Sequence, residues 1–219
     1  MVDSNVQSSR GVTLVGGGAP QAEDVRLLMS HAPDLVAADG GANACLRFGL
    51  PPLTVIGDFD SLTAETREAL PQTRFIHIAE QDSTDFQKCL ANIRAPFVLA
   101  TGFIARRVDH TLAALSALAR HNAYPVILLG EKDIAFSAPP SLVLPLDAGT
   151  RVSLFPVSRV QGRSTGLKWP IDGLTLSPDG RIGTSNEATG PITLDFDQNG
   201  CLVILPRAAL VVTLAALTG

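Results

Sequence analysis

The feature that most constrains this chain is a regular alternation of strand and helix signals between Val12 and Gly130. Short apolar or β-branched runs occur at residues 12–15, 35–38, 53–56, 75–78, 97–100 and 126–129. Apolar residues also recur at helical spacing between these runs. The first such stripe consists of Phe86, Cys89, Leu90 and Ile93, and the second of Val108, Leu112, Leu115 and Ala119. Continuous apolar strands between amphipathic helices are typical of a parallel sheet covered on both faces. We therefore predict a doubly wound α/β domain over residues 1–138.

The pattern changes after Gly130, and we interpret Pro139-Pro140 as a linker. No helical stripe follows, and short strands alternate with turn signals at residues 147–149, 178–180 and 199–200. Asn199-Gly200 is the dipeptide preferred in two-residue hairpins. We therefore predict a second, smaller, all-β domain over residues 139–219.

Composition excludes several classes of protein. The net charge is −4 and no basic run is present, which argues against a cationic nucleic-acid-binding face. The densest apolar stretch, residues 201–217, is interrupted by Pro206 and Arg207, so no membrane span is expected. Residues 1–10 are polar, so no secretory signal is expected either. The three cysteines stand far apart, which predicts buried thiols in a reducing cytoplasm.

Small and acidic residues follow the predicted strands. They fall at residues 16–18, 39–41, 57–61, 81–85 and 101–102. Ligands of open parallel sheets bind beyond the carboxyl ends of the strands, so these segments are expected to form one site.

Asp58 and Asp60 are the strongest signal at this edge. The two aspartates are two positions apart, so in an extended segment both side chains point the same way. Two carboxylates that close repel each other unless a cation lies between them. Carboxylate oxygens suit Mg²⁺, which binds one or two carboxylates together with substrate phosphates. Either aspartate alone is better explained as a helix cap, but the pair, joined by Asp39 and Asp85, favours a metal.

Two other functions remain open on the residues alone. Gly16-Gly17-Gly18, with Asp39 further along, is compatible with a nicotinamide-dependent oxidoreductase, although Gln21 stands where a third glycine is expected. A non-catalytic nucleotide-sensing module is the other possibility.

Several polar residues each have a structural alternative. Lys88 is either a solvated surface lysine or a phosphate ligand, and the residues before it are good helix N-caps. Arg107 and Asp109 are compatible with a local ion pair, and His110 with a structural role.

Trp169, the only tryptophan, is either a core residue or an exposed stacking platform. The neighbouring glycine, lysine and proline favour exposure. Residues 185–187 form either a turn or a hydrogen-bonding rim.

Taken together, these segments resemble the thiamine pyrophosphokinase family over nearly the whole chain. The matching motifs are Ala38-Asp39-Gly40-Gly41-Ala42-Asn43, Ile56-Gly57-Asp58-Phe59-Asp60-Ser61, Gln81-Asp82-Ser83-Thr84-Asp85-Phe86, Arg107-Val108-Asp109-His110, Thr165-Gly166-Leu167-Lys168-Trp169 and Ser185-Asn186. The resemblance implies an ATP-dependent transfer of pyrophosphate to the hydroxyl of thiamine, giving thiamine diphosphate and AMP. It also implies a sandwich-like β domain and a homodimer whose thiamine sites are shared between subunits, and the cysteines predict that it is cytoplasmic.

The resemblance also implies roles for individual residues. Asp58, Asp60 and Asp85 are the expected catalytic residues and Mg²⁺ ligands. The expected residues for binding ATP, thiamine or the metal are Asp39, Gly40, Gln81, Thr84, Lys88, Arg107, Asp109, Trp169, Ser185 and Asn186. Two departures affect ATP binding: Ala105-Arg106 replaces the usual glycine pair, and Ala114 replaces the usual asparagine.

Overall fold

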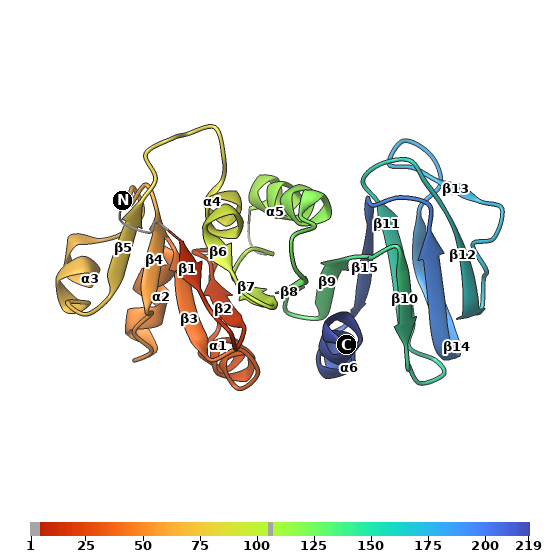
Figure 1. Cartoon of the computed structure of the whole chain (residues 1–219), viewed down its shortest axis with the longest axis horizontal. Helices are drawn as coiled ribbons and strands as arrows, with labels where there is room; N and C mark the ends of the chain where they lie inside the picture. Colours follow the sequence, from red (N-terminus) through yellow and green to blue (C-terminus); the bar gives the residue numbers. More distant parts are fainter. Residues whose placement is uncertain (1–4, 105–106) are drawn as a thin grey trace. The chain divides into compact units, whose positions relative to one another are not determined.

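The computed structural model describes residues 5–104 and 107–219, in two compact units, Met1–Ala117 and Leu118–Gly219. The first unit contains a parallel sheet and the second an antiparallel one (Figure 1). The α/β-plus-β organisation predicted from the sequence is therefore present.

The parallel sheet of the first unit has the strand order β7-β2-β3-β4-β5. Its strands are β2 (Val12–Val15), β3 (Asp34–Ala38), β4 (Thr54–Gly57), β5 (Arg74–His77) and β7 (Val98–Thr101). The strand order reverses at β2, whose neighbours are β3 and β7, and such a reversal is where open α/β sheets bind ligands. A separate short parallel pair joins β1 (Val6–Gln7) to β6 (Ile93–Arg94).

Helices lie on both faces of this sheet. They are α1 (Ala22–Met29), α2 (Gly41–Arg47), α3 (Ala64–Ala69), α4 (Asp85–Asn92) and α5 (Val108–Arg120). Val25 of α1 and Cys45 of α2 pack in one buried cluster with Val55 of β4. The neighbouring Ile56 points to the opposite face, where Cys89 of α4 lies against its carbonyl. Figure 1 shows α1 below the strands and α4 above them.

The expected apolar stripe of α5 is only partly correct. Ala119 is buried as expected, but Val108 and Leu112 are 70% and 59% exposed, and the buried face also carries Ala114, Ala117 and Leu118. A helix rich in alanine and leucine offers several apolar faces, so spacing alone did not identify the packed one.

The second unit is built from antiparallel pairs in the order β8-β9-β15-β11-β14-β12-β13, with β10 paired to β14. Its strands are β8 (Val126–Leu129), β9 (Asp133–Ser137), β10 (Ser141–Leu144), β11 (Arg151–Pro156), β12 (Val160–Leu167), β13 (Thr175–Leu176), β14 (Gly183–Phe196) and β15 (Cys201–Pro206). The first half of β14 pairs with β11 and the second half with β10 and β12.

Two expectations for this unit are wrong. Asn199-Gly200 does not close a hairpin, because β14 and β15 lie on opposite edges of β11. The unit is also not all-β, since a short helical turn, η1 (Arg207–Ala209), leads into α6 (Leu210–Thr218). Residues 210–218 are apolar on almost every side, so they carry no 3.6-residue stripe to reveal a helix.

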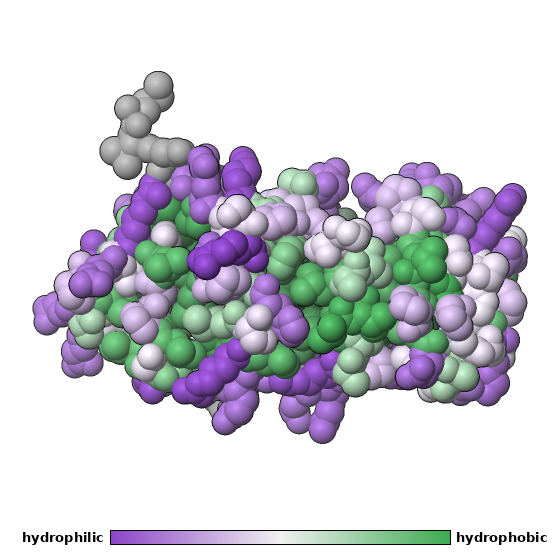
Figure 2. Space-filling model, turned by 60° about the horizontal axis from the view of Figure 1, so that its bottom comes forward, coloured by the Kyte–Doolittle hydropathy of each residue, from purple (hydrophilic) through white to green (hydrophobic). Residues whose placement is uncertain are grey.

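Apolar side chains are exposed around this terminal helix. Val211 of α6 is 56% exposed and Val143 of β10 is 60% exposed. Figure 2 shows a broad apolar area in its right half, where α6 lies in Figure 1. None of the helices in the described part of the chain combines the length and hydropathy needed to cross a bilayer.

Candidate active site

A cleft of about 670 Å³ opens at the carboxyl ends of the parallel strands. The residues expected at the site that line it are Gly40, Asp58, Asp60, Gln81, Thr84, Asp85, Lys88 and Arg107. Each comes from a segment that follows a strand or begins a helix, as the sequence predicted.

Three carboxylates converge at this cleft. Asp39, Asp58 and Asp60 each present an oxygen, and these oxygens lie within 4.8 Å of one another. The sequence predicted Asp85 as the third ligand beside Asp58 and Asp60. Asp85 lines the same cleft, but the carboxylate oxygen that lies with theirs belongs to Asp39. The tertiary structure therefore brings Asp39 closer to the aspartate pair than its sequence position indicates.

The Asp58–Asp60 pair is not extended, contrary to the sequence prediction. Phe59 between them has φ of 67°, in the left-handed region that bulky side chains rarely adopt. The backbone N–H of Asp60 donates to Asp58 Oδ1 at 3.2 Å, which closes a tight turn. The Phe59 ring packs edge-on against the Phe75 ring, with 5.8 Å between the two centroids. The Arg67 guanidinium lies 5.4 Å from the centroid of the Phe59 ring.

Neither aspartate of this pair caps the following helix. Helix α3 begins at Ala64, and its N-cap is Thr63, whose hydroxyl accepts a hydrogen bond from the N–H of Thr66 at 3.2 Å. The capping interpretation of Asp58 and Asp60 is therefore wrong, and their carboxylates face the cleft.

Asp39 is fully buried and incompletely hydrogen-bonded. Its Oδ2 accepts from the N–H of Ser61 at 3.1 Å, whereas its Oδ1 has no partner among the described residues. Burial, with smaller contributions from Asp60 and Asp85, raises the pKa of Asp39 to about 6. Gly57 makes room for this side chain, because a Cβ there would lie 2.8 Å from Asp39 Cβ.

Lys88 is buried, so the interpretation as a solvated surface lysine is wrong. Its Nζ donates to Asp58 Oδ2 at 2.7 Å and lies 3.9 Å from Asp85 Oδ1. The hydrogen bond from Lys88 holds the pKa of Asp58 below its usual value. Burial disfavours the charged form of Lys88, but the contact with Asp58 outweighs it and raises the Lys88 pKa.

The start of α4 places three expected residues. Thr84 is the N-cap and forms a capping box with Gln87, as its residue type predicted. Gln81 Nε2 donates to Asp58 Oδ2 at 3.1 Å. Asp85 opens the helix, and burial, followed by the charge of Asp58, raises the pKa of its carboxyl.

Arg107 and Asp109 form the local ion pair that the sequence allowed. The guanidinium donates twice to the carboxylate, at 3.1 and 2.5 Å, and both side chains are largely exposed. His110 is exposed and lines the cleft. Ala114 also lines the cleft, and Ala105-Arg106 lie outside the described residues.

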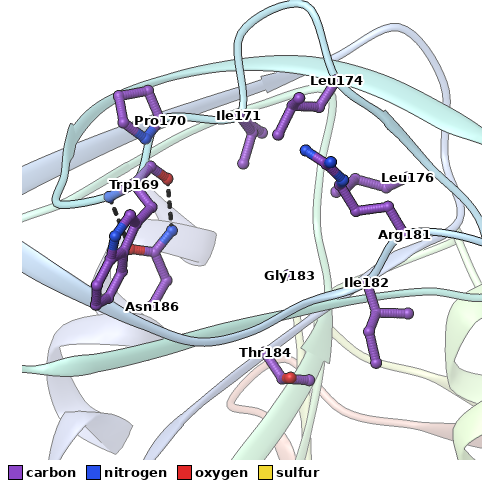
Figure 3. A pocket seen from close by; sticks show the side chains of 10 residues that line it. All are labelled: Trp169, Pro170, Ile171, Leu174, Leu176, Arg181, Ile182, Gly183, Thr184 and Asn186. Atoms are coloured by element: carbon purple, nitrogen blue, oxygen red, sulfur yellow. Dashed lines mark hydrogen bonds between the residues drawn. The ribbon is translucent and has the colours of Figure 1, made fainter.

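In the second unit, Trp169 is 54% exposed, so the core interpretation is wrong. Its backbone N–H donates to Asn186 Oδ1 at 3.2 Å, and Asn186 Nδ2 donates to its carbonyl at 2.7 Å (Figure 3). Trp169 and Asn186 line a small pocket of about 180 Å³. Lys168 Nζ lies 4.9 Å from the Trp169 ring centroid.

Ser185 is exposed and has φ of 61°. The other non-glycine residues with positive φ in the described chain are Ala19, Asp39 and Phe59. Strained backbone of this kind clusters at functional sites, and Asp39, Phe59 and Ser185 fall in segments singled out from the sequence, whereas Ala19 directly follows one.

Sequence reasoning missed the residues that brace the acidic loop. Asn43 donates to the carbonyl of Ser61 at 2.8 Å and accepts from the N–H of Thr63 at 3.2 Å, which ties α2 to the loop. Phe103 packs on Phe86, with 4.6 Å between centroids, and lines the cleft. Asn43, two residues after the Gly40-Gly41 pair, was a usable signal, whereas Phe103 carried none.

Comparison with known proteins agrees with this geometry. Residues 25–128 match the family described as "Thiamin pyrophosphokinase, catalytic domain", and residues 142–200 match "Thiamin pyrophosphokinase, vitamin B1 binding domain". Thiamin pyrophosphokinase 1 of Caenorhabditis elegans is 30% identical over 184 residues, which cover 74% of each chain.

Solved structures agree as well. The thiamin pyrophosphokinase of Geobacillus thermodenitrificans is 26% identical with a TM-score of 0.72, covering 90% of this chain and 96% of that one. The Candida albicans enzyme, at 15% identity, has a TM-score of 0.77 and covers 93% of this chain and 94% of its own, which shows the same fold. From the matched domains and the relative of 30% identity, the chain belongs to the thiamin pyrophosphokinase family.

Proposed function

We propose that this chain transfers the pyrophosphoryl group of ATP to the hydroxyl of thiamine, giving thiamine diphosphate and AMP. The observation that carries the proposal is the acidic cluster in the cleft of a chain that belongs to this family. The two alternatives, an oxidoreductase and a nucleotide sensor, have no support from the related proteins. The glycine of the first loop also has a packing role, since a Cβ at Gly16 would lie 2.7 Å from the Gly102 carbonyl oxygen.

The acidic cluster fits a divalent cation of the Mg²⁺ type. Asp39, Asp58 and Asp60 supply the hard oxygen ligands that Mg²⁺ prefers, and Asp39 Oδ1 is buried without a partner among the described residues. An unpaired buried carboxylate oxygen is unfavourable unless a cation or proton approaches it. We propose these three residues as ligands, with Asp85 as the further ligand expected from the sequence. Bound Mg²⁺ would neutralise charge on the phosphate oxygens.

The remaining groups of the cleft would bind and orient the nucleotide. The Lys88 ammonium lies beside Asp58 and Asp85 and cannot offset the whole acidic group, so these carboxylates by themselves repel a polyphosphate. Lys88 holds Asp58 in place, and Gly40, Gln81 and Thr84 complete the wall near the helix N-termini. We propose that Arg107 exchanges its bond to Asp109 for a phosphate oxygen, because guanidinium groups bind phosphate in the same bidentate way.

In this reaction the thiamine hydroxyl oxygen bonds to the β-phosphorus of ATP. The bond from that phosphorus to the α,β-bridging oxygen breaks, and AMP leaves with this oxygen. The hydroxyl proton passes to a base or to water. Alignment of the two substrates and charge stabilisation account for the rate enhancement, without a covalent intermediate on the protein.

Thiamine would be held by Trp169, Ser185 and Asn186. An exposed indole suits stacking on a cationic heteroaromatic ring. The amide of Asn186 is engaged with the Trp169 backbone, so we propose that Asn186 orients the indole. Following the family resemblance, we propose a homodimer in which each thiamine site combines the first domain of one subunit with the second domain of its partner.

We also propose the finer points of organisation. Residues 1–138 would act as a doubly wound catalytic domain and residues 139–219 as a sandwich-like thiamine-binding domain. We propose a cytoplasmic location, because Cys45, Cys89 and Cys201 are free, buried thiols.

The central test is AMP release in the presence of ATP, Mg²⁺ and thiamine. We expect AMP to form only when thiamine is present. Asp60→Asn should lower kcat by about 10²-fold or more, because a charge at the phosphoryl-transfer site is lost. Asp82→Asn is the matched control, as Asp82 lies in a neighbouring loop but does not line the cleft. AMP release without thiamine, or full activity of Asp60→Asn, would contradict the proposal.

Mixed dimers test the shared site. At thiamine concentrations below the KM, Trp169→Ala and Asp60→Asn should both be much less active than the wild type, but a co-refolded mixture contains heterodimers with one site free of both changes. Such a mixture should regain activity. If heterodimers form and remain as inactive as their parents, each site belongs to a single chain.

A further inference from the structure

The backbone of the second unit contains a β-bulge at Ser185. In the pairing of β11 with β14, Val152 is opposite Asn186 and Leu154 is opposite Gly183. Ser153 therefore faces two residues, Thr184 and Ser185, and the chain accommodates the extra residue by placing Ser185 at φ 61°. Bulges re-aim side chains and are frequent beside active sites.

The bulge takes the N–H of Ser185 out of the regular ladder, and the side chain of Ser153 provides its acceptor. Ser153 is 5% exposed, and its Oγ accepts from the Ser185 N–H at 3.0 Å. Arg151 Nη1 donates to the same oxygen at 3.4 Å, and Arg151 Nη2 pairs with Asp133 of β9. A hydroxyl oxygen has two lone pairs, so both donors can be satisfied at once.

The residues held by this bulge are those that we propose for thiamine. Ser185 is the bulged residue, Asn186 follows it, and the Asn186 amide is hydrogen-bonded to the backbone of Trp169. The buried Ser153 hydroxyl is therefore connected to Trp169 in three steps: it bonds to Ser185, Ser185 is followed by Asn186, and Asn186 bonds to the Trp169 backbone that carries the indole. Figure 3 shows the last of these contacts, between Asn186 and Trp169.

We infer that Ser153 is a positioning residue for thiamine, which holds the bulge that aims Ser185 and, through Asn186, sets Trp169. This inference rests on the proposed function for the identity of the ligand. Ser153 itself does not touch the substrate in this account. Arg151, two residues before Ser153 on β11 and paired with Asp133 of β9, orients its hydroxyl.

The test compares Ser153→Ala with Ser141→Ala. The control removes a hydroxyl from the same unit that donates to Asp195 at 2.6 Å and has no contact with the bulge. Trp169 is the only tryptophan, so its fluorescence reports thiamine binding directly in the full chain. We expect Ser153→Ala to bind thiamine about tenfold more weakly, because the Ser185 N–H loses its acceptor and the bulge that places Ser185 and Asn186 is no longer held. ATP affinity and kcat should be unchanged, and Ser141→Ala should bind thiamine normally.

Amide hydrogen exchange gives a second measurement that does not depend on the ligand. The Ser185 N–H should exchange slowly in the unliganded protein and rapidly in Ser153→Ala. Wild-type thiamine affinity in Ser153→Ala, or equal losses of thiamine and ATP binding, would overturn the inference.

Failure of the proposed function and misfolding of the variant can each be distinguished from failure of this inference. If the wild-type protein does not bind thiamine, the proposed function fails, and exchange at Ser185 still decides whether Ser153 holds the bulge. If Ser153→Ala does not fold, Arg151→Met carries the test, because it removes the donor that orients the hydroxyl. Unchanged thiamine affinity and unchanged Ser185 exchange in Arg151→Met would then overturn the inference.

Discussion

The substitution Lys88→Met is predicted to destabilise the metal-free protein through Asp58. Methionine keeps an apolar chain of similar length but removes the ammonium 2.7 Å from Asp58 Oδ2. Removing one partner of a buried ion pair costs about 3–5 kcal/mol of unfolding free energy. Asp58 retains hydrogen bonds from Gln81 at 3.1 Å and from the N–H of Asp60 at 3.2 Å. We therefore expect a loss near the lower limit, about 3 kcal/mol.

The pH dependence of this loss identifies its origin. The pKa of Asp58 is lowered from 3.8 in the folded protein, so the ion pair stabilises the protein above that pH. This stability disappears as the pH falls through the lowered pKa. In Lys88→Met, Asp58 takes up a proton under milder acid, so the difference from the wild type should shrink below about pH 4. Saturating Mg²⁺ near neutral pH should restore part of the loss, since a cation again faces the carboxylates.

Urea unfolding followed by far-UV circular dichroism measures this effect. Lys132→Met is the matched control, because Lys132 is 83% exposed and lies 3.8 Å from Glu131. The control should change stability by less than about 1 kcal/mol. A loss in Lys88→Met that is equal at neutral and acid pH would show that side-chain packing, rather than the ion pair, is responsible.

Three further outcomes follow from the same geometry. Asp39→Asn should stabilise the metal-free protein near neutral pH by up to about 3 kcal/mol in thermal unfolding, because the wild-type carboxylate, with a pKa of about 6, is buried in its charged form at that pH and lowers the free energy of unfolding. The variant should also bind Mg²⁺ more weakly in calorimetry. An unchanged Mg²⁺ affinity would exclude Asp39 as a ligand. Phe59→Leu should lose about 1 kcal/mol of stability with its contacts to Phe75 and Arg67, and Mg²⁺ affinity should fall with it; a stable variant with normal metal binding would show that the ring does not hold the turn. Trp169→Ala should stay folded, because the side chain is 54% exposed. The KM for thiamine should rise by the factor that corresponds to a loss of about 1–2 kcal/mol of binding free energy. A parallel rise in the KM for ATP would argue against stacking.

Local patterns predicted most of the first unit. The apolar runs that follow one another from Val12 match the observed parallel strands within one residue at each end. Thr84 and its capping box were also readable, because a cap depends on residues only three apart. These features are fixed by neighbouring residues, so the sequence contains the necessary information.

Predictions failed where the local pattern was ambiguous. The helix α6 is apolar on nearly every side, and α5 offers more than one apolar face, so periodicity did not identify α6 or the packed face of α5. Asn199-Gly200 has the composition of a hairpin turn, but the strands that it joins each pair with β11. Strand order depends on contacts between distant segments, which turn composition does not report.

The sequence by itself determined which chemical groups gather at the strand ends, because parallel strands bring their carboxyl ends to one edge. Only the tertiary structure decided how these groups meet. It placed Asp39 beside the Asp58–Asp60 turn, buried Lys88 against an aspartate 30 residues away, and put Ser153 beneath the bulge at Ser185. The physical reason is that burial, backbone strain and ion pairing at these positions arise from packing between segments far apart in the chain, whereas residue type and spacing describe only near neighbours.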